Sequence, residues 1–182
     1  VALVLGWSGL ANANLIVNGD FSTGDFSGWD LFTTATGTLG HVGSNTVTSF
    51  DVTGGGDSLA GRFQVGGSPF TGTYQGGGIS QTILLGGSNL DISLDIAAWD
   101  SIASNGSNGN WGLFQLLLDD VVVDFINFGE PSCCDTVRNS LSYSGAPGAG
   151  NHEIAIQMTR PFTIGSGVGS TPFQYIDNVV AT

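Results

Sequence analysis

The sequence predicts an all-β fold: one antiparallel β-sandwich domain of the jelly-roll type, with about ten strands. Short apolar runs alternate with polar residues at the period of two that marks a half-buried strand. Glycine accounts for 30 of the 182 residues, and clusters of Gly, Ser and Asn separate the runs. A chain of this length suits a single domain with a sizeable core.

The clearest predicted strand covers residues 90–96, where Leu90, Ile92, Leu94 and Ile96 share one face and polar residues occupy the other. Residues 153–158 repeat this alternation. Similar patterns predict strands near residues 14–17, 29–34, 46–52, 59–65, 79–85, 112–118, 121–128, 138–143 and 173–181.

Two neighbouring segments, residues 116–118 and 121–128, are apolar on both faces. One face of an antiparallel sandwich strand normally meets water. We expect a central strand covered by a loop, and the alternative is an outer face covered by a partner subunit. Between the two segments, Asp119-Asp120 indicates a hairpin turn rather than the carboxylate pair of a glycoside hydrolase.

The charge balance excludes several classes of partner. The chain has three arginines, no lysine and 15 acidic residues, which gives a formal net charge of -12. Nucleic-acid binding needs a basic face, and adhesion to anionic lipid needs basic clusters. No stretch reaches the roughly 18 consecutive apolar residues of a membrane-spanning helix. We therefore expect neither nucleic-acid binding nor membrane insertion.

Residues suited to catalysis do not form a recognisable set. His41 and His152 are far apart in the sequence, and neither belongs to a metal or triad motif. On a strand, His152 and Glu153 would point to opposite faces. The sequence therefore predicts that the protein is not an enzyme.

Three motifs resemble a known family. Residues 14–21, NLIVNGDF, continue through Gly24-Asp25-Phe26 to Gly28-Trp29. This opening is similar to that of exported bacterial jelly-roll domains of the carbohydrate-binding-module-like type, found in proteins with a PEP-CTERM sorting tail. Residues 79–82, ISQT, and residues 174–180, QYIDNVV, resemble an inner strand and the closing strand of that family. The resemblance implies a sandwich domain over residues 14–182, export to the bacterial surface and glycan partners.

The resemblance also implies a structural calcium ion between the first and last strands. Asp20, Asp25 and Asp177 are the candidate ligands, although Ser22 stands where relatives have an acidic residue. Calcium takes six to eight oxygen ligands. In the alternative interpretation, Asp20 and Asp177 stabilise turns through their side-chain oxygens.

Sugar-binding sandwiches stack aromatic side chains on sugar rings and add a few polar groups. Trp111, Trp99 and Tyr74 are the candidates, and Trp111 is the best of them because it follows an Asn/Gly-rich stretch. Burial in the core is the alternative for each. Trp29 belongs to the family opening and is expected in the core.

Two further motifs concern covalent modification. Cys133 and Cys134 are adjacent, so they are candidates for a vicinal disulfide, an intermolecular bond or free thiols. Asn105-Gly106-Ser107 matches the N-glycosylation sequon and lies in a loop-like stretch.

Residues 1–13 form a separate apolar segment with a signal-peptide-like ending, Ala11-Asn12-Ala13. The segment is a retained signal-peptide piece, an extra edge strand of its own domain, or a donor strand for the next subunit. The side chains expected to drive assembly are Val1, Leu3, Val4, Leu5 and Trp7.

Donor-strand insertion predicts a head-to-tail homopolymer, in which the protein is the structural subunit of an extracellular filament. The alternative function is a secreted, lectin-like carbohydrate-binding module. Both interpretations place the protein outside the cell, at the cell surface or in a biofilm matrix.

Overall fold

The computed structural model describes residues 13–33, 45–63, 75–99, 111–129, 135–160 and 173–182. Within these ranges the chain forms strands and no helix, so none of them is a helix long and apolar enough to cross a membrane. The strands are β1 (Asp30–Thr33), β2 (Thr46–Phe50), β3 (Ser58–Phe63), β4 (Gln75–Leu85), β5 (Leu90–Trp99), β6 (Leu113–Leu118), β7 (Val121–Asn127), β8 (Thr136–Gly145), β9 (Gly150–Arg160) and β10 (Phe173–Ala181).

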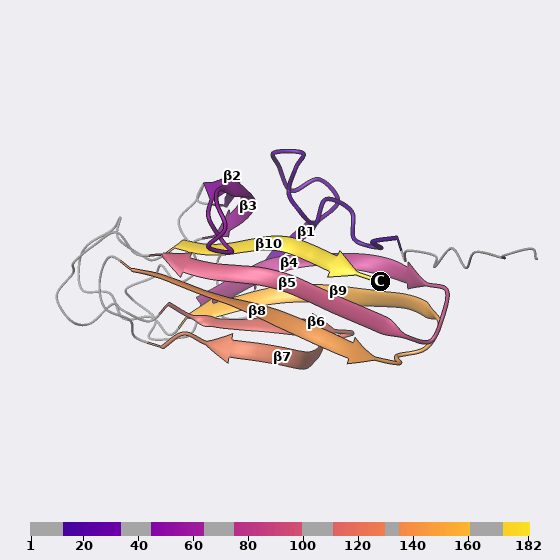
Figure 1. Cartoon of the computed structure of the whole chain (residues 1–182). Coiled ribbons are helices and arrows are strands. Elements are labelled where there is room, and N and C mark those ends of the chain that lie inside the picture. Colours follow the sequence, from indigo (N-terminus) through magenta and orange to yellow (C-terminus); the bar gives the residue numbers. More distant parts are fainter. Residues whose placement is uncertain (1–12, 34–44, 64–74, 100–110, 130–134, 161–172) are drawn as a thin grey trace, which may run out of the picture.

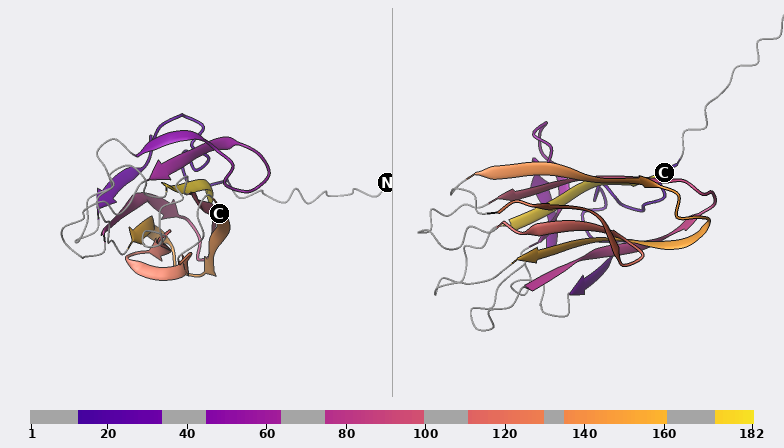
Figure 2. Two further views of the ribbon diagram at one scale, coloured as in Figure 1. Left: turned by 90° about the vertical axis from the view of Figure 1, so that its left-hand side faces the viewer. Right: turned by 90° about the horizontal axis from the view of Figure 1, so that it is seen from below.

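Two five-stranded antiparallel sheets lie face to face (Figure 1). Sheet A has the strand order β1-β4-β9-β6-β7, and sheet B has the order β2-β3-β10-β5-β8. Figure 2 shows the two layers from other directions. The predicted all-β sandwich of about ten strands is confirmed, with ten strands in the described part of the chain.

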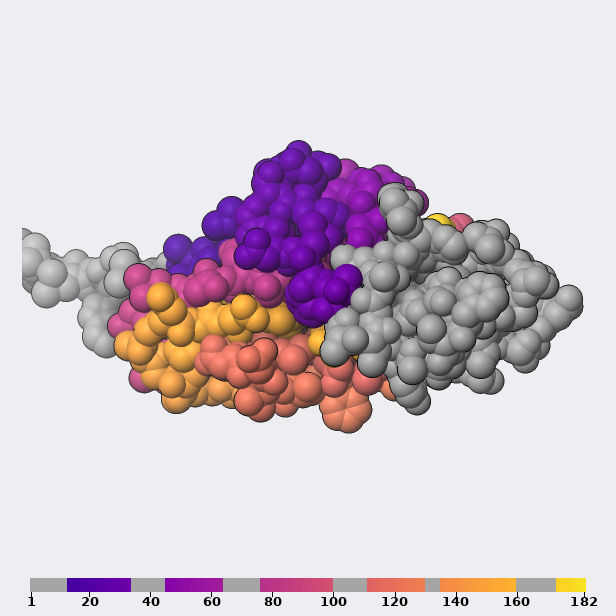
Figure 3. Space-filling model, turned by 180° about the vertical axis from the view of Figure 1, so that it is seen from behind, coloured from indigo at the N-terminus to yellow at the C-terminus, as the bar shows by residue number. Residues whose placement is uncertain are grey.

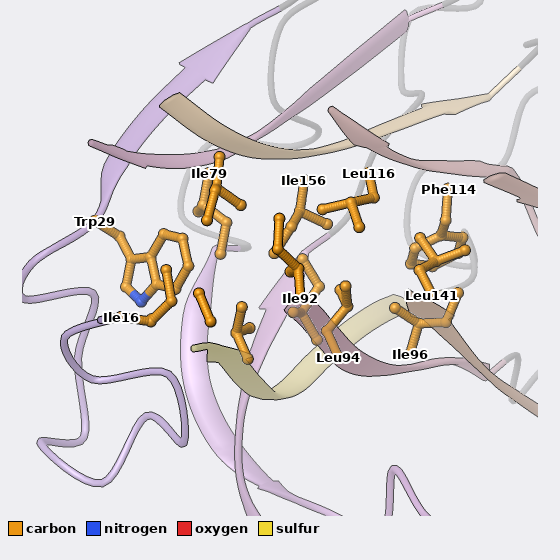
Figure 4. Close-up of a cluster of buried hydrophobic side chains, with 14 of the residues drawn as sticks. Ile16, Trp29, Ile79, Ile92, Leu94, Ile96, Phe114, Leu116, Leu141 and Ile156 are labelled. Carbon is orange, nitrogen blue, oxygen red and sulfur yellow. The ribbon is translucent and has the colours of Figure 1, made fainter. Parts of the chain in front are cut away.

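The core lies between the sheets, where the alternating apolar residues of both layers meet (Figure 4). Ile79, Leu116 and Ile156 come from sheet A, and Leu94 and Ile96 from sheet B, and all five are fully buried. Each such side chain contributes roughly 1.5–3 kcal/mol to folding. The period-two pattern of the sequence therefore identified the inward faces correctly.

The opening residues join the end of β10 by hydrogen bonds that include a side chain, without forming a regular strand. Residues 14–17 do not form the predicted strand. Instead, the Leu15 N–H donates to the Ala181 carbonyl at 2.8 Å, and the Asn14 carboxamide oxygen accepts from the Ala181 N–H at 2.9 Å. Strand β3 pairs with β10 at Gln174–Ile176. The opening segment bonds to the same strand nearer its end, at Ala181.

The ISQT motif also has a structural role. The Gln81 side chain accepts from the Val17 N–H at 2.7 Å and donates to the Gly28 carbonyl at 2.6 Å. Trp29 is buried, as expected, and its indole N–H donates to the Asn18 carbonyl at 3.0 Å. The opening motif therefore packs onto the sandwich through Gln81 and Trp29.

The two doubly apolar segments form neighbouring strands with different surroundings. Strand β6 lies inside sheet A, but β7 is an edge strand, so the expectation of a central covered strand fails for residues 121–128. Val121, Val122 and Phe125 are exposed. Asp119 and Asp120 form the β6–β7 turn with φ angles of 50° and 64°, which confirms the predicted hairpin.

Candidate functional site

The best aromatic candidate of the sequence lies in the core. Only 1% of Trp111 is exposed. The backbone N–H of Trp111 donates to the Gly129 carbonyl at 2.9 Å, and its backbone carbonyl accepts from the Gln174 side chain at 3.3 Å. The prediction of a glycan-stacking Trp111 is wrong, because the polar stretch before it does not prevent a large aromatic side chain from filling the core.

Trp99 is half-buried on the outer face of sheet B. Its ring stacks on that of Phe173, with centroids 6.1 Å apart and planes at 12°. The Arg62 guanidinium lies 4.7 Å from the Phe173 ring centroid. Trp99 therefore belongs to an aromatic cluster on this face, and its proposed contact with a glycan stays a prediction.

Several predicted residues lie outside the described ranges, so the predictions about them stay predictions. They are Tyr74, Asn105, Cys133, Cys134 and the assembly residues Val1, Leu3, Val4, Leu5 and Trp7.

The three candidate calcium ligands occupy different environments. The Asp25 carboxylate accepts from the Ser27 N–H at 2.9 Å and from the Thr23 hydroxyl at 2.8 Å, within its own turn. Asp20 accepts from the Ser22 N–H at 3.2 Å. These bonds, led by those from Ser27 and Ser22, lower the pKa of Asp25 and Asp20. Both residues thus stabilise turns, as the alternative interpretation predicts for Asp20.

Asp177 is fully buried. Its carboxylate accepts from the Ser58 hydroxyl at 2.5 Å and from the Asn178 N–H at 2.7 Å. Burial raises the pKa of Asp177 despite these two bonds. Within the described residues, no three acidic, histidine or cysteine side chains are placed to hold a metal ion. The predicted ligand set does not fit calcium as arranged here.

The strongest candidate site is a row of residues across the outer face of sheet A. The strand registers place one residue from each of the five strands in line, in the order of the sheet. We call this line the cross-sheet row: Phe32, Gly78, Gln157, Gln115 and Phe125. With adjacent strands about 4.8 Å apart, the row spans roughly 19 Å.

The centre of the row is an amide pair. The Nε2 of Gln157 donates to the Oε1 of Gln115 at 3.1 Å. Both side chains are half-buried. Each carboxamide has further donor or acceptor capacity beyond this bond. The pair therefore presents both kinds of hydrogen-bonding group at fixed positions.

Aromatic rings stand at the two ends of the row. Phe125 lies beside Gln115 on the edge strand β7, and 64% of it is exposed. Phe32, which is half-buried, lies on the edge strand β1 beside Gly78. A Cβ added at Gly78 would clash with the Ile156 carbonyl and lie 2.8 Å from Cζ of Phe32. The absence of a side chain here lets the Phe32 ring lie against the backbone of β4.

The surface on either side of the row is almost uncharged. On one side lie Gly76, Thr159, Leu113 and Asn127, and on the other Asp30, Ser80, Ala155, Leu117 and Val122. Asp30, at the β1 edge, is the one charged residue in these three rows. Figure 3 looks onto this side of the molecule. Such a surface suits an uncharged ligand rich in hydroxyl groups.

Sequence reasoning did not identify the cross-sheet row. For residues 121–128 the doubly apolar pattern led to the expectation of a loop-covered central strand, with a partner-covered outer face only as the alternative. The register between five distant segments, which brings Gln115 and Gln157 together, cannot be read from alternation alone.

Comparison with known proteins gives a fold relationship. No family model and no curated protein matches the chain. Among solved structures, TmCBM61 in complex with β-1,4-galactotriose aligns with a TM-score of 0.59 and 11% identity, over 94% of this chain and 99% of that one. The chain shares its β-sandwich fold with a carbohydrate-binding module.

The enzymatically active domain of bacteriophage CBA120 tailspike protein 4 also contains a similar fold. It aligns with a TM-score of 0.54 and 17% identity over 92% of this chain. This chain spans only 21% of the tailspike structure. The two neighbours confirm the β-sandwich fold that the opening and closing motifs predict, and the first of them is a carbohydrate-binding module. The link to PEP-CTERM proteins stays a prediction.

Proposed function

We propose that this chain is a non-catalytic carbohydrate-binding module that binds an uncharged polysaccharide across the outer face of sheet A. The cross-sheet row is the observation that carries the proposal. Its amide pair supplies hydrogen bonds to sugar hydroxyls, and Phe125 and Phe32 supply apolar ring contacts at either end.

Charge favours an uncharged ligand. The chain has a formal net charge of -12, and no basic residue occurs in the three rows described above. Two of the three arginines, Arg62 and Arg138, belong to strands β3 and β8 of sheet B, and the third, Arg160, is the last residue of β9, outside the three rows. A polyanion approaching the three rows would meet the repulsion of a net negative protein, and none of these rows contains a compensating cation.

The shape of the site favours a chain of sugars over a single sugar. The row extends across all five strands and has no side chain at Gly78 to interrupt it. Because TmCBM61 was solved with β-1,4-galactotriose, β-1,4-galactan is the first polysaccharide to test. Export to the cell surface is part of the proposal, since the motif resemblance implies it and polysaccharides are abundant there.

The filament hypothesis is the second candidate, and it receives less support. Its assembly segment lies outside the described residues, whereas the neighbouring fold is that of a glycan-binding domain. The exposed apolar residues of the β7 edge are compatible with a self-partner, but Phe125 also completes the cross-sheet row. Assembly with copies of itself stays a prediction.

The proposal is tested by affinity electrophoresis and calorimetry on β-1,4-galactan, xylan and an unsubstituted β-glucan. We expect binding to at least one, and about tenfold weaker binding for Phe125→Ala and for Gln157→Ala, because each removes a ring contact or hydrogen bonds. Leu84→Ala is the matched control, since Leu84 is 70% exposed on β4 and lies outside the row.

Binding by the Leu84→Ala protein should equal that of the wild type, and all variants should retain the wild-type melting temperature within a few degrees. Failure of the wild type to bind any of the three polysaccharides would overturn the proposal. So would binding that survives both Phe125→Ala and Gln157→Ala unchanged.

A further inference from the structure

A groove on the opposite side of the sandwich forms a separate polar site. It has a volume of about 210 Å³ and lies on the outer face of sheet B, where the β2–β3 turn meets β5 and β8. It is lined by Val52, Thr53, Asp95, Arg138, Asn139 and Ser140. The groove lies on the outer face of sheet B and the cross-sheet row on the outer face of sheet A, so the two share no residue.

The wall of the groove is fixed by the β2–β3 turn. The Asp51 carboxylate accepts from the Gly54 N–H at 2.6 Å and from the Gly56 N–H at 3.2 Å, which closes the turn. Val52, next in the chain, is 1% exposed and packs with Ala97 and Tyr175 on the outer face of sheet B. The turn is thereby anchored over the sheet by an apolar contact.

Arg138 links this turn to β8. Its Nε donates to the Asp51 carbonyl at 3.0 Å, and its Nη2 lies 3.2 Å from the Asp51 carboxylate. A guanidinium has five N–H donors, so three remain after these two bonds. The ion pair orients Arg138 while leaving donors available at the groove.

Asp95 supplies the acceptor on the other side. Its Oδ2 accepts from the Asn178 carboxamide at 2.9 Å, which leaves Oδ1 for another donor. Asp95 lies directly opposite Ser140 in the β5–β8 register, and Arg138 is two residues from Ser140 on the same face. Diagonal neighbours of this kind are about 7–8 Å apart. A carboxylate, a hydroxyl and a guanidinium therefore meet in one small groove.

The charges of the groove restrict the ligand. Asp51 and Asp95 outnumber Arg138, and Arg138 is already paired with Asp51. An anion would face an excess of negative charge, whereas neighbouring hydroxyl groups could donate to Asp95 and accept from Arg138. The volume is below the range usual for drug-sized ligands, about 300–1,000 Å³. The ligand is therefore small, uncharged and hydroxyl-rich.

We propose that this groove is a second binding site, specific for a single uncharged sugar unit, either a free monosaccharide or the end unit of a glycan chain. It is independent of the polysaccharide site proposed on sheet A. The two sites on opposite faces would allow the module to contact two glycans at once.

The test is NMR titration of the ¹⁵N-labelled whole chain with three uncharged sugars, D-galactose, D-xylose and β-1,4-galactotriose. D-glucuronate, a negatively charged sugar, is titrated for comparison. We expect saturable shifts of the amides of residues 52–53 and 138–140 with the uncharged sugars and none with glucuronate. Shifts with the monosaccharides identify a free-sugar site, and shifts with galactotriose alone identify a chain-end site.

Variants assign the effect to the groove. Asp95→Asn should weaken binding there about tenfold, because it removes a charged acceptor. Asp91→Asn, four residues away on the same face of β5, is the control and should bind as the wild type does. Ser140→Ala, a smaller change, should weaken binding about threefold and keeps the test valid if Asp95→Asn fails to fold.

Phe125→Ala should leave these shifts unchanged, which separates this site from the one on sheet A. The proposal is overturned if none of the uncharged sugars shifts the groove amides, or if glucuronate alone does. Shifts confined to residues of the cross-sheet row would also refute it while leaving the proposed polysaccharide site intact.

Discussion

The Nδ1 of His152 lies 2.7 Å from the Oδ2 of Asp119, although 33 residues separate the two in the sequence. The Nε2 of the same imidazole lies 3.1 Å from the Gly148 carbonyl. Both ring nitrogens therefore face acceptors, which favours the doubly protonated, charged imidazole. Asp119 sits in the β6–β7 turn and Gly148 in the β8–β9 connection, so the charged ring joins two neighbouring turns of the sandwich.

We predict that this pair makes stability depend on pH. The hydrogen bond that His152 donates to the Asp119 carboxylate raises the pKa of His152 above 6.5 and lowers that of Asp119 below 3.8. The contribution of His152 is complete below its unfolded pKa and is lost as pH rises through the higher, folded pKa. The melting temperature should therefore stay level below about pH 6.5 and fall as the pH rises from there through the higher, folded pKa of His152.

The contribution of Asp119 to stability is lost at low pH instead of high pH. It is present above the unfolded pKa of Asp119 and is lost as the pH falls through the lower, folded value. The Asp119→Asn protein, measured in parallel by thermal melts, should lose most of the slope near neutral pH. An identical slope in wild type and variant would show that other groups cause it.

The buried Asp177 carboxylate leads to a second prediction, that Asp177→Asn stabilises the protein at neutral pH. Asparagine can accept from the Asn178 N–H and donate to the Ser58 hydroxyl oxygen, so both contacts of Asp177 can be kept. The substitution removes a buried charge whose pKa is raised by desolvation. Because a raised folded pKa favours the protonated form, the advantage of Asn should shrink as pH falls through that pKa.

Chemical denaturation at several pH values measures this difference, and the same proteins test the predicted calcium. With the ligands arranged as described, a chelator should leave the melting temperature of the wild type unchanged. If a chelator instead lowers the melting temperature of the wild type but not that of the Asp177→Asn protein, a calcium site at Asp177 would be established.

The sequence predicted the sandwich well because burial imposes alternation locally. Leu94 and Ile96 of β5 are buried as their spacing requires, and Asp119-Asp120 forms the expected turn. The segment at residues 14–17 failed because its backbone is bonded partly by the Asn14 side chain rather than by a ladder. A segment whose backbone is bonded by a side chain instead of a neighbouring strand need not alternate apolar and polar residues, so its sequence pattern does not reveal it.

The candidate site was harder to predict because it depends on register. Gln115 and Gln157 are 42 positions apart and belong to strands whose alignment is set by three-dimensional packing. Trp111 was misassigned because local polarity suggested a loop edge. Its backbone is held by hydrogen bonds with Gly129 and Gln174, which lie in other segments of the chain, so local polarity does not determine the position of Trp111.

A third prediction concerns Trp111, whose replacement should affect stability rather than glycan binding. Trp111→Ala removes a side chain that is 1% exposed, which should cost about 3–5 kcal/mol of unfolding free energy. Urea denaturation followed by circular dichroism measures this cost. Trp99→Ala, at a half-buried position on sheet B, should cost distinctly less, and equal costs would contradict the assignment of Trp111 to the core.

The last prediction concerns the segment before the sandwich. Deletion of residues 1–12 should leave the melting temperature unchanged, because the variant keeps the bonds by which Asn14 and Leu15 join the opening to β10. Thermal melts and sedimentation of both proteins measure stability and assembly together. Donor-strand assembly requires polymers of the intact chain that disappear on deletion. If the intact chain sediments as a monomer, or if the deletion variant still polymerises, that mode of assembly is wrong, while the glycan sites on sheets A and B are unaffected, since neither contains a residue of the deleted segment.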